Sequence, residues 1–222
     1  RLKDAGIRLI FTTGNHDYGG MDAGDYERAY FGLLDPVDRD PDSLSYTSIV
    51  KDTVFFAMDD NAVHQGGEGE FSSATMQWLE DTLARYKGRN IVFLSHHNVL
   101  FGYRTDVASS NLIQNEELAS LLKKYDVRLA MTGHAHFQYI LEKDGLWEIL
   151  SGMPFSGGHL VGNLAVGGDR AVYYAEPIDF ASYGNNISER LEELDRESTL
   201  DMKSVISQLL DQEGLSGSQK KQ

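Results

Sequence analysis

The chain has 222 residues, of which 41% are hydrophobic, and this is enough for one globular domain with a sizeable core. It carries 20 Lys and Arg residues against 34 Asp and Glu residues, a formal net charge of −14, which argues against nucleic acid or anionic lipid as the main partner. No stretch approaches the ~18 consecutive apolar residues of a membrane-spanning helix. The absence of cysteine excludes disulfides and thiolate metal sites. The composition fits a cytoplasmic protein as well as a secreted or lipid-anchored one.

The beginning of the chain has the pattern of an interrupted fold. Residues 1–5 resemble the last turn of a helix, which Gly6 would close at the C′ position. The apolar segment 7–13 is predicted to be a strand that leads into Gly14-Asn15-His16-Asp17. Because a parallel sheet needs earlier strands and crossovers, we expect the sequence to be a fragment or trimmed form of a longer chain.

A loop region, residues 18–45, comes next and contains a short predicted helix at 26–33. Segments 46–50 and 53–58 predict a hairpin that turns at Lys51-Asp52. A helix is expected from about residue 73 to 86, with Ser72 or Ser73 as its cap. The apolar strand 90–94 then leads into Ser95-His96-His97-Asn98.

The second half of the chain begins with a long loop, residues 98–111, and a predicted helix at 114–125. Strand 127–131 leads into Gly133-His134-Ala135-His136. Short β-like runs follow at 137–142, 146–150, 159–166 and 171–175, and they predict an antiparallel extension of a second sheet. We expect a main domain over residues 1–182, a charged helical extension over 183–213 and a disordered polar tail over 214–222.

Three of the predicted strands end in residue types that bind metals. In open parallel sheets the carboxyl ends of the strands share one edge, where ligands bind. The turns after residues 13, 94 and 132 should therefore bring their polar side chains together. If the backbone stays extended after residue 132, His134 and His136 project to the same side and can converge on one metal ion.

In this order, Gly14-Asn15-His16-Asp17, a histidine pair and Gly133-His134-Ala135-His136 resemble the C-terminal motifs of the calcineurin-like metallophosphoesterases, over roughly residues 1–178. The resemblance implies an α/β fold, a four-layer αββα sandwich of two mixed sheets flanked by helices, here lacking its first strands and helices. Family members carry two earlier motifs, Asp-x-His and Gly-Asp-x-x-Asp. Neither motif occurs before Gly14.

The resemblance also implies roles for individual residues. Asn15, His96 and His134 would bind one divalent metal ion, and His136 would bind a second. His96 is preferred to His97 because the family's ligand lies two positions before a residue that is usually proline, here Asn98. His16 would contact the substrate phosphate and help the leaving oxygen depart, while Asp17 would accept a hydrogen bond from its imidazole.

In the family, two metal ions activate a bridging hydroxide that attacks a phosphomonoester or phosphodiester. Ligands without sulfur suit Mn, Fe, Zn, Ni or Co. Because the bridging carboxylate belongs to an earlier motif, we expect this sequence to bind one metal ion or none and to turn over slowly. The alternative is a phosphoesterase-fold interaction module without catalysis.

The expected substrate is a small phosphate ester. Weaker candidates for contacting it are Tyr103 and Arg104 in the loop 98–111, and His159 after a pair of glycines. A sheet that lacks its first strands would expose an edge, and this predicts a homodimer through that edge.

Overall fold

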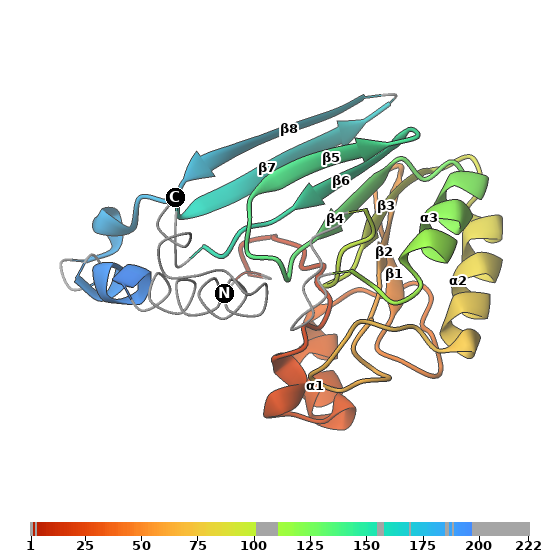
Figure 1. Ribbon diagram of the computed structural model, residues 1–222, viewed down its shortest axis with the longest axis horizontal. Coiled ribbons are helices and arrows are strands. Elements are labelled where there is room, and N and C mark those ends of the chain that lie inside the picture. Colours follow the sequence, from red (N-terminus) through yellow and green to blue (C-terminus); the bar gives the residue numbers. More distant parts are fainter. Residues whose placement is uncertain are drawn as a thin grey trace, which may run out of the picture. The chain divides into compact units, whose positions relative to one another are not determined.

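The computed structural model describes residues 2, 4–100, 111–154, 158–168, 170–184, 187 and 189–196. These residues form two compact units: the first is the described part of Arg1–Ser151 with Leu164–Tyr173, and the second is the described part of Gly152–Asn163 and Tyr174–Gln222. Figure 1 labels the helices and strands. In chain order the elements are η1 (Asp17–Gly19), α1 (Ala23–Tyr30), η2 (Phe31–Leu33), β1 (Tyr46–Val50), β2 (Thr53–Ala57), α2 (Ser73–Arg85), β3 (Asn90–Leu94), α3 (Asn115–Lys124), β4 (Leu129–Thr132), β5 (Tyr139–Lys143), β6 (Leu146–Leu150), β7 (Leu160–Gly167), β8 (Arg170–Pro177) and η3 (Phe180–Tyr183).

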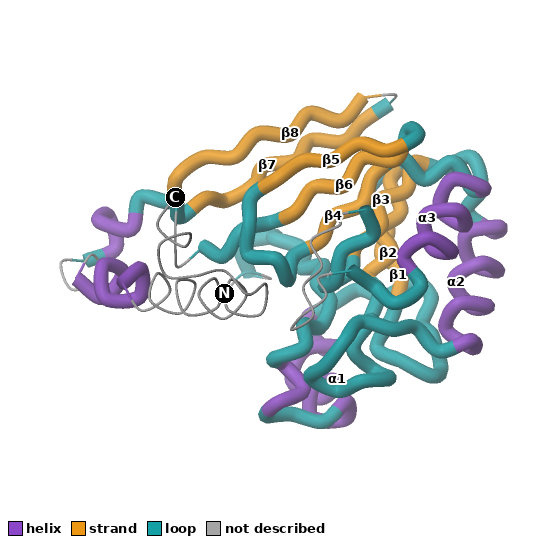
Figure 2. The backbone as a smooth tube through the Cα atoms, in the orientation of Figure 1, coloured by secondary structure: helices purple, strands orange, loops and turns teal. Residues whose placement is uncertain are grey.

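A mixed six-stranded sheet dominates the first unit, with the strand order β1-β2-β3-β4-β6-β5. The four central strands pair in parallel, and the outer strands β1 and β5 pair antiparallel to their neighbours. Each outer strand is joined to its neighbour by a tight turn, and Lys51, Asp144 and Gly145 adopt the left-handed conformation there. The predicted α/β class is confirmed, as is the hairpin at Lys51-Asp52 (Figure 2).

Helices α2 and α3 cover one face of this sheet. The Ser72 side chain accepts the backbone N–H of Thr75 and begins α2, as its sequence predicted. Both helices bury leucines one turn apart, and these pack on side chains from one face of β2, β3 and β4. The core formed in this way includes Val54, Phe56, Leu79, Leu83, Ile91, Phe93, Leu118, Leu122 and Ala130. The helices therefore hold the central strands in place.

The segment 7–13 differs from its prediction, because it is not a strand. Leu9, Ile10 and Phe11 pack against a smaller cluster that contains Tyr46 and Ala57. Among the described residues no strand pairs with this segment. The Tyr46 hydroxyl takes the place of a strand partner, since it accepts the Phe11 N–H at 3.0 Å and donates to the Phe11 carbonyl at 2.9 Å.

The strands after His136 also differ from their prediction. β5 and β6 extend the main sheet, because β6 pairs in parallel with β4, whereas β7 and β8 form a separate two-stranded sheet. Within the expected extension, residue 183 ends η3 and residues 187 and 189–196 are helical. Residues 185, 186, 188 and 197–222, which include the whole expected tail, lie outside the described residues. None of the helices in the described part of the chain is long and apolar enough to cross a membrane.

Tyr46→Phe is expected to destabilise the protein by about 1–3 kcal/mol, because it leaves the Phe11 N–H and carbonyl without their buried partner. Urea unfolding monitored by circular dichroism measures this change. Tyr174→Phe removes a hydroxyl from a side chain that is 56% exposed and should change the free energy of unfolding very little. Equal losses in the two variants would contradict the proposed anchoring of residues 7–13.

Candidate metal centre

The loops after β3 and β4 lie at the same edge of the sheet because the two strands are parallel and in register, with Leu94 opposite Met131. Two backbone hydrogen bonds continue this pairing beyond the strands. The Ser95 N–H donates to the Met131 carbonyl at 3.2 Å, and the Gly133 N–H donates to the His96 carbonyl at 3.0 Å. The convergence predicted from the sequence therefore has a direct backbone cause.

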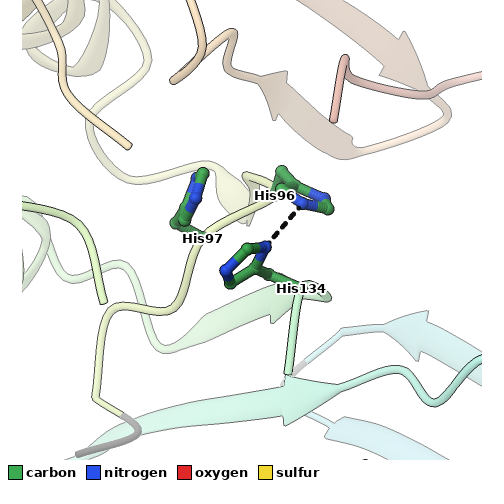
Figure 3. A group of neighbouring side chains, drawn as sticks. All are labelled: His96, His97 and His134. Atoms are coloured by element: carbon green, nitrogen blue, oxygen red, sulfur yellow. Dashed lines mark hydrogen bonds between the residues drawn. The ribbon is translucent and has the colours of Figure 1, made fainter. Parts of the chain in front are cut away.

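His96 lies at the centre of the candidate site. Its Nε2 is 2.9 Å from the Asn15 Oδ1 and 3.0 Å from the His134 Nδ1. Figure 3 shows the His96 and His134 rings turned toward one another, joined by this second contact. Three segments that are far apart in the sequence thus bring together the three side chains predicted to share one metal ion.

The backbone of the last loop is not extended, in contrast to the prediction. His134 and His136 have φ angles of +57° and +59°, in the left-handed region that non-glycine residues seldom adopt. The turn directs the His134 ring toward His96, whereas His136 lies at the exposed side of the site. Among the described residues, the histidines whose nitrogens gather within 4.8 Å of one another are His96, His97 and His134.

His97 lies fully buried beneath His134, and their ring centroids are 4.2 Å apart. Its backbone N–H donates to the buried Asp60 carboxylate at 2.6 Å, while neither ring nitrogen has a hydrogen-bond partner among the described residues. A Cβ at Gly69 would lie 2.5 Å from the His97 ring, so glycine is required for this close approach. No local pattern in the sequence indicated the roles of Asp60 and Gly69.

Asp59 is a second buried carboxylate, and it fixes the loop that carries Asn15 and His16. It accepts the Thr13 hydroxyl at 2.5 Å and the Tyr18 hydroxyl at 2.7 Å, so it binds the residues on both sides of that loop. Burial raises the pKa of Tyr18, and the charge of Asp59 raises it further. The Tyr18 hydroxyl therefore stays protonated and remains a donor at neutral pH.

Comparison with known proteins identifies the family of the chain. The sequence profile of the calcineurin-like phosphoesterases matches residues 1–138. The chain belongs to the calcineurin-like phosphoesterase family. No curated protein matches it in sequence.

Two solved structures are similar to this chain. A dimetal phosphatase from Danio rerio has a TM-score of 0.51 and 14% sequence identity over 68% of this chain and 63% of that one. A protein assigned as a 5′-nucleotidase from Staphylococcus aureus has a TM-score of 0.49 and 19% identity over 83% of this chain and 42% of that one. The chain thus spans less than two thirds of either structure, and the likeness to the Danio rerio protein concerns the fold.

Asn98 occupies the position where the family usually has proline, and its side chain makes two hydrogen bonds to the loop of His134. Its Nδ2 donates to the Thr132 hydroxyl oxygen at 2.8 Å and to the Gly133 carbonyl at 3.0 Å. A proline could make neither bond, since its side chain has no donor. In this chain the amide of Asn98 therefore joins the two histidine loops directly.

Asp17 makes a backbone contact that the sequence did not predict. Its Oδ2 accepts the Gly14 N–H at 2.7 Å, and among the described residues no hydrogen bond joins it to the His16 imidazole. His16 and Asp17 are both exposed. Asp17 thus stabilises the turn that presents Asn15 and His16.

Of the three weaker candidates for substrate contact, the structure describes His159 and leaves out Tyr103 and Arg104. His159 belongs to the second compact unit, where its Nε2 is 3.0 Å from the Asp195 Oδ2 and its Nδ1 is 3.1 Å from the Pro154 carbonyl oxygen. Both ring nitrogens of His159 therefore have partners within that unit. Tyr103 and Arg104 lie outside the described residues.

The electrostatic environment favours neutral imidazoles at the site. Burial, followed by the charges that the neighbouring histidines would carry, lowers the pKa of His96 from 6.5 to about 3. Burial also lowers the pKa of His136, and nearby His16 contributes to this shift. Neutral imidazole nitrogens and an amide oxygen are the donors that a divalent transition metal accepts, so the residues present fit such an ion.

The depressed pKa of His96 predicts a pH dependence of the metal-free protein. Between pH 6.5 and about 3 the unfolded chain binds a proton at His96 that the folded chain does not. The free energy of unfolding should therefore fall as the pH drops through this range. His96→Asn should reduce that dependence, which urea unfolding at about pH 7 and about pH 5 measures. Identical pH dependence in the two proteins would contradict the assignment.

Proposed function

We propose that this phosphoesterase hydrolyses a small phosphate ester with the help of a divalent metal ion held by Asn15, His96 and His134. The convergence of these three side chains supports the proposal more than any other observation. His136 is proposed as a ligand of a second ion on the exposed side of the same site. Membership of the phosphoesterase family supports this chemical class, and both phosphomonoesters and phosphodiesters remain within it.

A bound divalent ion would supply a Lewis acid that acidifies water and neutralises charge on the phosphate. The protein's own contribution is to hold the ligands close together and to keep their imidazoles neutral and ready to bind. A local positive charge from the ion would also let an anionic substrate approach a chain whose net charge is −14. The strongly acidic composition is therefore compatible with a phosphate ester as substrate.

His16 is the proposed catalytic histidine. It is exposed, and it lies close enough to both His96 and His136 to affect their pKa values. An imidazole at this position can contact a substrate phosphate from the solvent side and donate a proton to the departing oxygen. The Gly14 N–H bond to Asp17 and the Tyr18 bond to Asp59 would fix its loop during this transfer.

Loss of a metal ligand is expected to abolish metal-dependent turnover. His96→Ala should weaken Mn²⁺ binding by more than the about 10–100-fold that loss of an outer-shell partner costs. Calorimetric titration with Mn²⁺ and hydrolysis of bis-p-nitrophenyl phosphate and p-nitrophenyl phosphate measure the two effects. His64→Ala, which changes a half-exposed histidine outside the cluster, is the control.

The wild-type chain is expected to bind one Mn²⁺ ion and to turn over slowly, because His136 is the one proposed ligand for a second ion in the part of the chain that the structure describes. A wild-type protein that neither binds Mn²⁺ nor hydrolyses either ester would contradict the proposed function. That result would favour the interaction module. Fast turnover with two bound ions would show that the site is more complete than its described ligands indicate.

His16→Asn is expected to lower kcat by about 100-fold or more while leaving Mn²⁺ affinity close to that of the wild type. Asp17→Asn should have a smaller effect, because an amide oxygen can still accept the Gly14 N–H. Steady-state kinetics combined with calorimetry separates the two roles. A larger loss in Asp17→Asn than in His16→Asn would overturn this assignment.

A homodimer remains a proposal. The edge of β1 is covered by residues 37–39, since Val37 and Asp38 hydrogen-bond with Thr47. β5 is the other outer strand, and its Tyr139 and Ile140 are 53% and 45% exposed. We expect light scattering to show association that increases with protein concentration. A monomer at every concentration would exclude pairing through β5.

A further inference from the structure

We propose that Glu148 is a positioning residue for the metal centre: its buried carboxylate clamps the two histidine loops together and so sets the spacing of His96 and His134. The proposal rests on the proposed function, because it assigns Glu148 a role at that same site. No metal-ligand motif includes Glu148, and it lies on a strand that carries none of the candidate ligands.

The position of Glu148 contradicts the hydrophobic pattern of its strand. It lies at the centre of β6 with no exposed surface, between the buried Leu146 and Leu150. Its neighbour across the sheet is Ala130, which belongs to the core beneath α2 and α3. An ionisable group in such a place costs free energy unless hydrogen bonds compensate it. A leucine there would fit the hydrophobic pattern without this cost, so the carboxylate must be compensated by specific hydrogen bonds.

Both oxygens of Glu148 accept bonds from the loop that follows His97. Oε1 accepts the Val99 N–H at 2.7 Å, and Oε2 accepts the Leu100 N–H at 2.7 Å. Two consecutive backbone amides are thereby held by one side chain. The loop that begins with the histidine pair is fixed to β6 immediately after Asn98.

The same carboxylate also reaches the second histidine loop. The Thr132 hydroxyl donates to Oε1 at 2.8 Å, and its oxygen accepts the Asn98 Nδ2 at 2.8 Å. Because the Thr132 oxygen accepts a hydrogen bond from Asn98, its own O–H is free to donate to Glu148. Thr132 lies two residues before His134, and Asn98 lies two residues after His96. The network therefore joins the loops close to both ligands.

This arrangement has consequences for metal binding. A metal site tolerates only small displacements of its ligands, and groups that orient the ligands commonly change affinity by about 10–100-fold. Glutamine has nearly the same shape as glutamate, but its NH₂ group would face the N–H of Val99 or Leu100. Glu148→Gln should loosen the clamp without creating a cavity.

Asp40→Asn is the matched control. Asp40 is 3% exposed and accepts hydrogen bonds from the Asp42 N–H at 3.1 Å, the Ser43 hydroxyl at 2.6 Å and the Thr75 hydroxyl at 2.8 Å. It is a buried carboxylate with several donors, like Glu148, but these partners lie outside the histidine loops. A purely structural role for Glu148 predicts that both variants lose stability and that both retain metal affinity.

The experiment titrates the wild type, Glu148→Gln and Asp40→Asn with Mn²⁺ by calorimetry, and records the visible absorption of each protein with Co²⁺. Metal-free thermal unfolding gives the stability of each protein. We expect Glu148→Gln to bind Mn²⁺ about 10–100-fold more weakly and to show an altered Co²⁺ spectrum. Asp40→Asn should match the wild type in both metal measurements.

Thr132→Val provides an independent variant if Glu148→Gln does not fold, because it keeps the side-chain shape and removes the hydroxyl between Glu148 and Asn98. Like Glu148→Gln, it should weaken Mn²⁺ binding relative to the wild type. Wild-type affinity in Glu148→Gln or Thr132→Val, or an equal loss in Asp40→Asn, would overturn this inference alone. Failure of the wild type to bind either ion would overturn the proposed function and this inference together.

Discussion

The parallel pairing of β3 with β4 is the constraint on which the candidate metal centre depends. The register that places Leu94 opposite Met131 makes the two strands end side by side, and the bond from Gly133 to His96 continues the ladder into the loops. Helices α2 and α3 pack on one face of these strands and bury side chains of β2, β3 and β4. The site is therefore positioned by strands that this core holds in place.

Hydrogen bonds to buried carboxylates fix the conformation of the loops at the end of the sheet. Loops at the end of a sheet contain polar backbone groups, and an apolar side chain cannot fix their conformation. Here buried carboxylates accept those groups: Asp59 holds the loop of Asn15, Asp60 accepts the N–H of His97, and Glu148 holds the residues after it. Burial makes each of these groups costly unless it is fully bonded, so the loops have few alternative conformations. This rigidity suits a site in which several neutral imidazoles must remain close together.

The chain joins its two histidine loops with side-chain hydrogen bonds. Asn98 makes two hydrogen bonds to the loop of His134, at the position where the family usually has proline, and the network of Glu148 and Thr132 extends this link. The comparison with the Danio rerio phosphatase supports the fold at 14% identity, where few side chains are shared. The hydrogen bonds that orient the candidate ligands are therefore known from this chain's own contacts.

Local patterns in the sequence determined most of the helices and strands of the first unit. The helical spacing of leucines predicted α2 and α3, and β-branched and aromatic runs predicted β1 to β4. These elements depend on residues close together in the chain, for which periodicity and capping are sufficient. The order of three short motifs resembled a known family, and this resemblance implied the roles of Asn15, His96 and His134. Tertiary contacts determined the conformation of segment 7–13, the orientation of the His134 ring and the hydrogen bonds of Glu148. Segment 7–13 bonds to Tyr46 instead of entering a sheet, and the His134 backbone adopts a left-handed turn that directs its ring to His96. Glu148 bonds to residues nearly fifty positions away, at a separation for which the sequence has no local signature. Such contacts form only when the sheet brings distant segments together, and for this reason the structure alone revealed them.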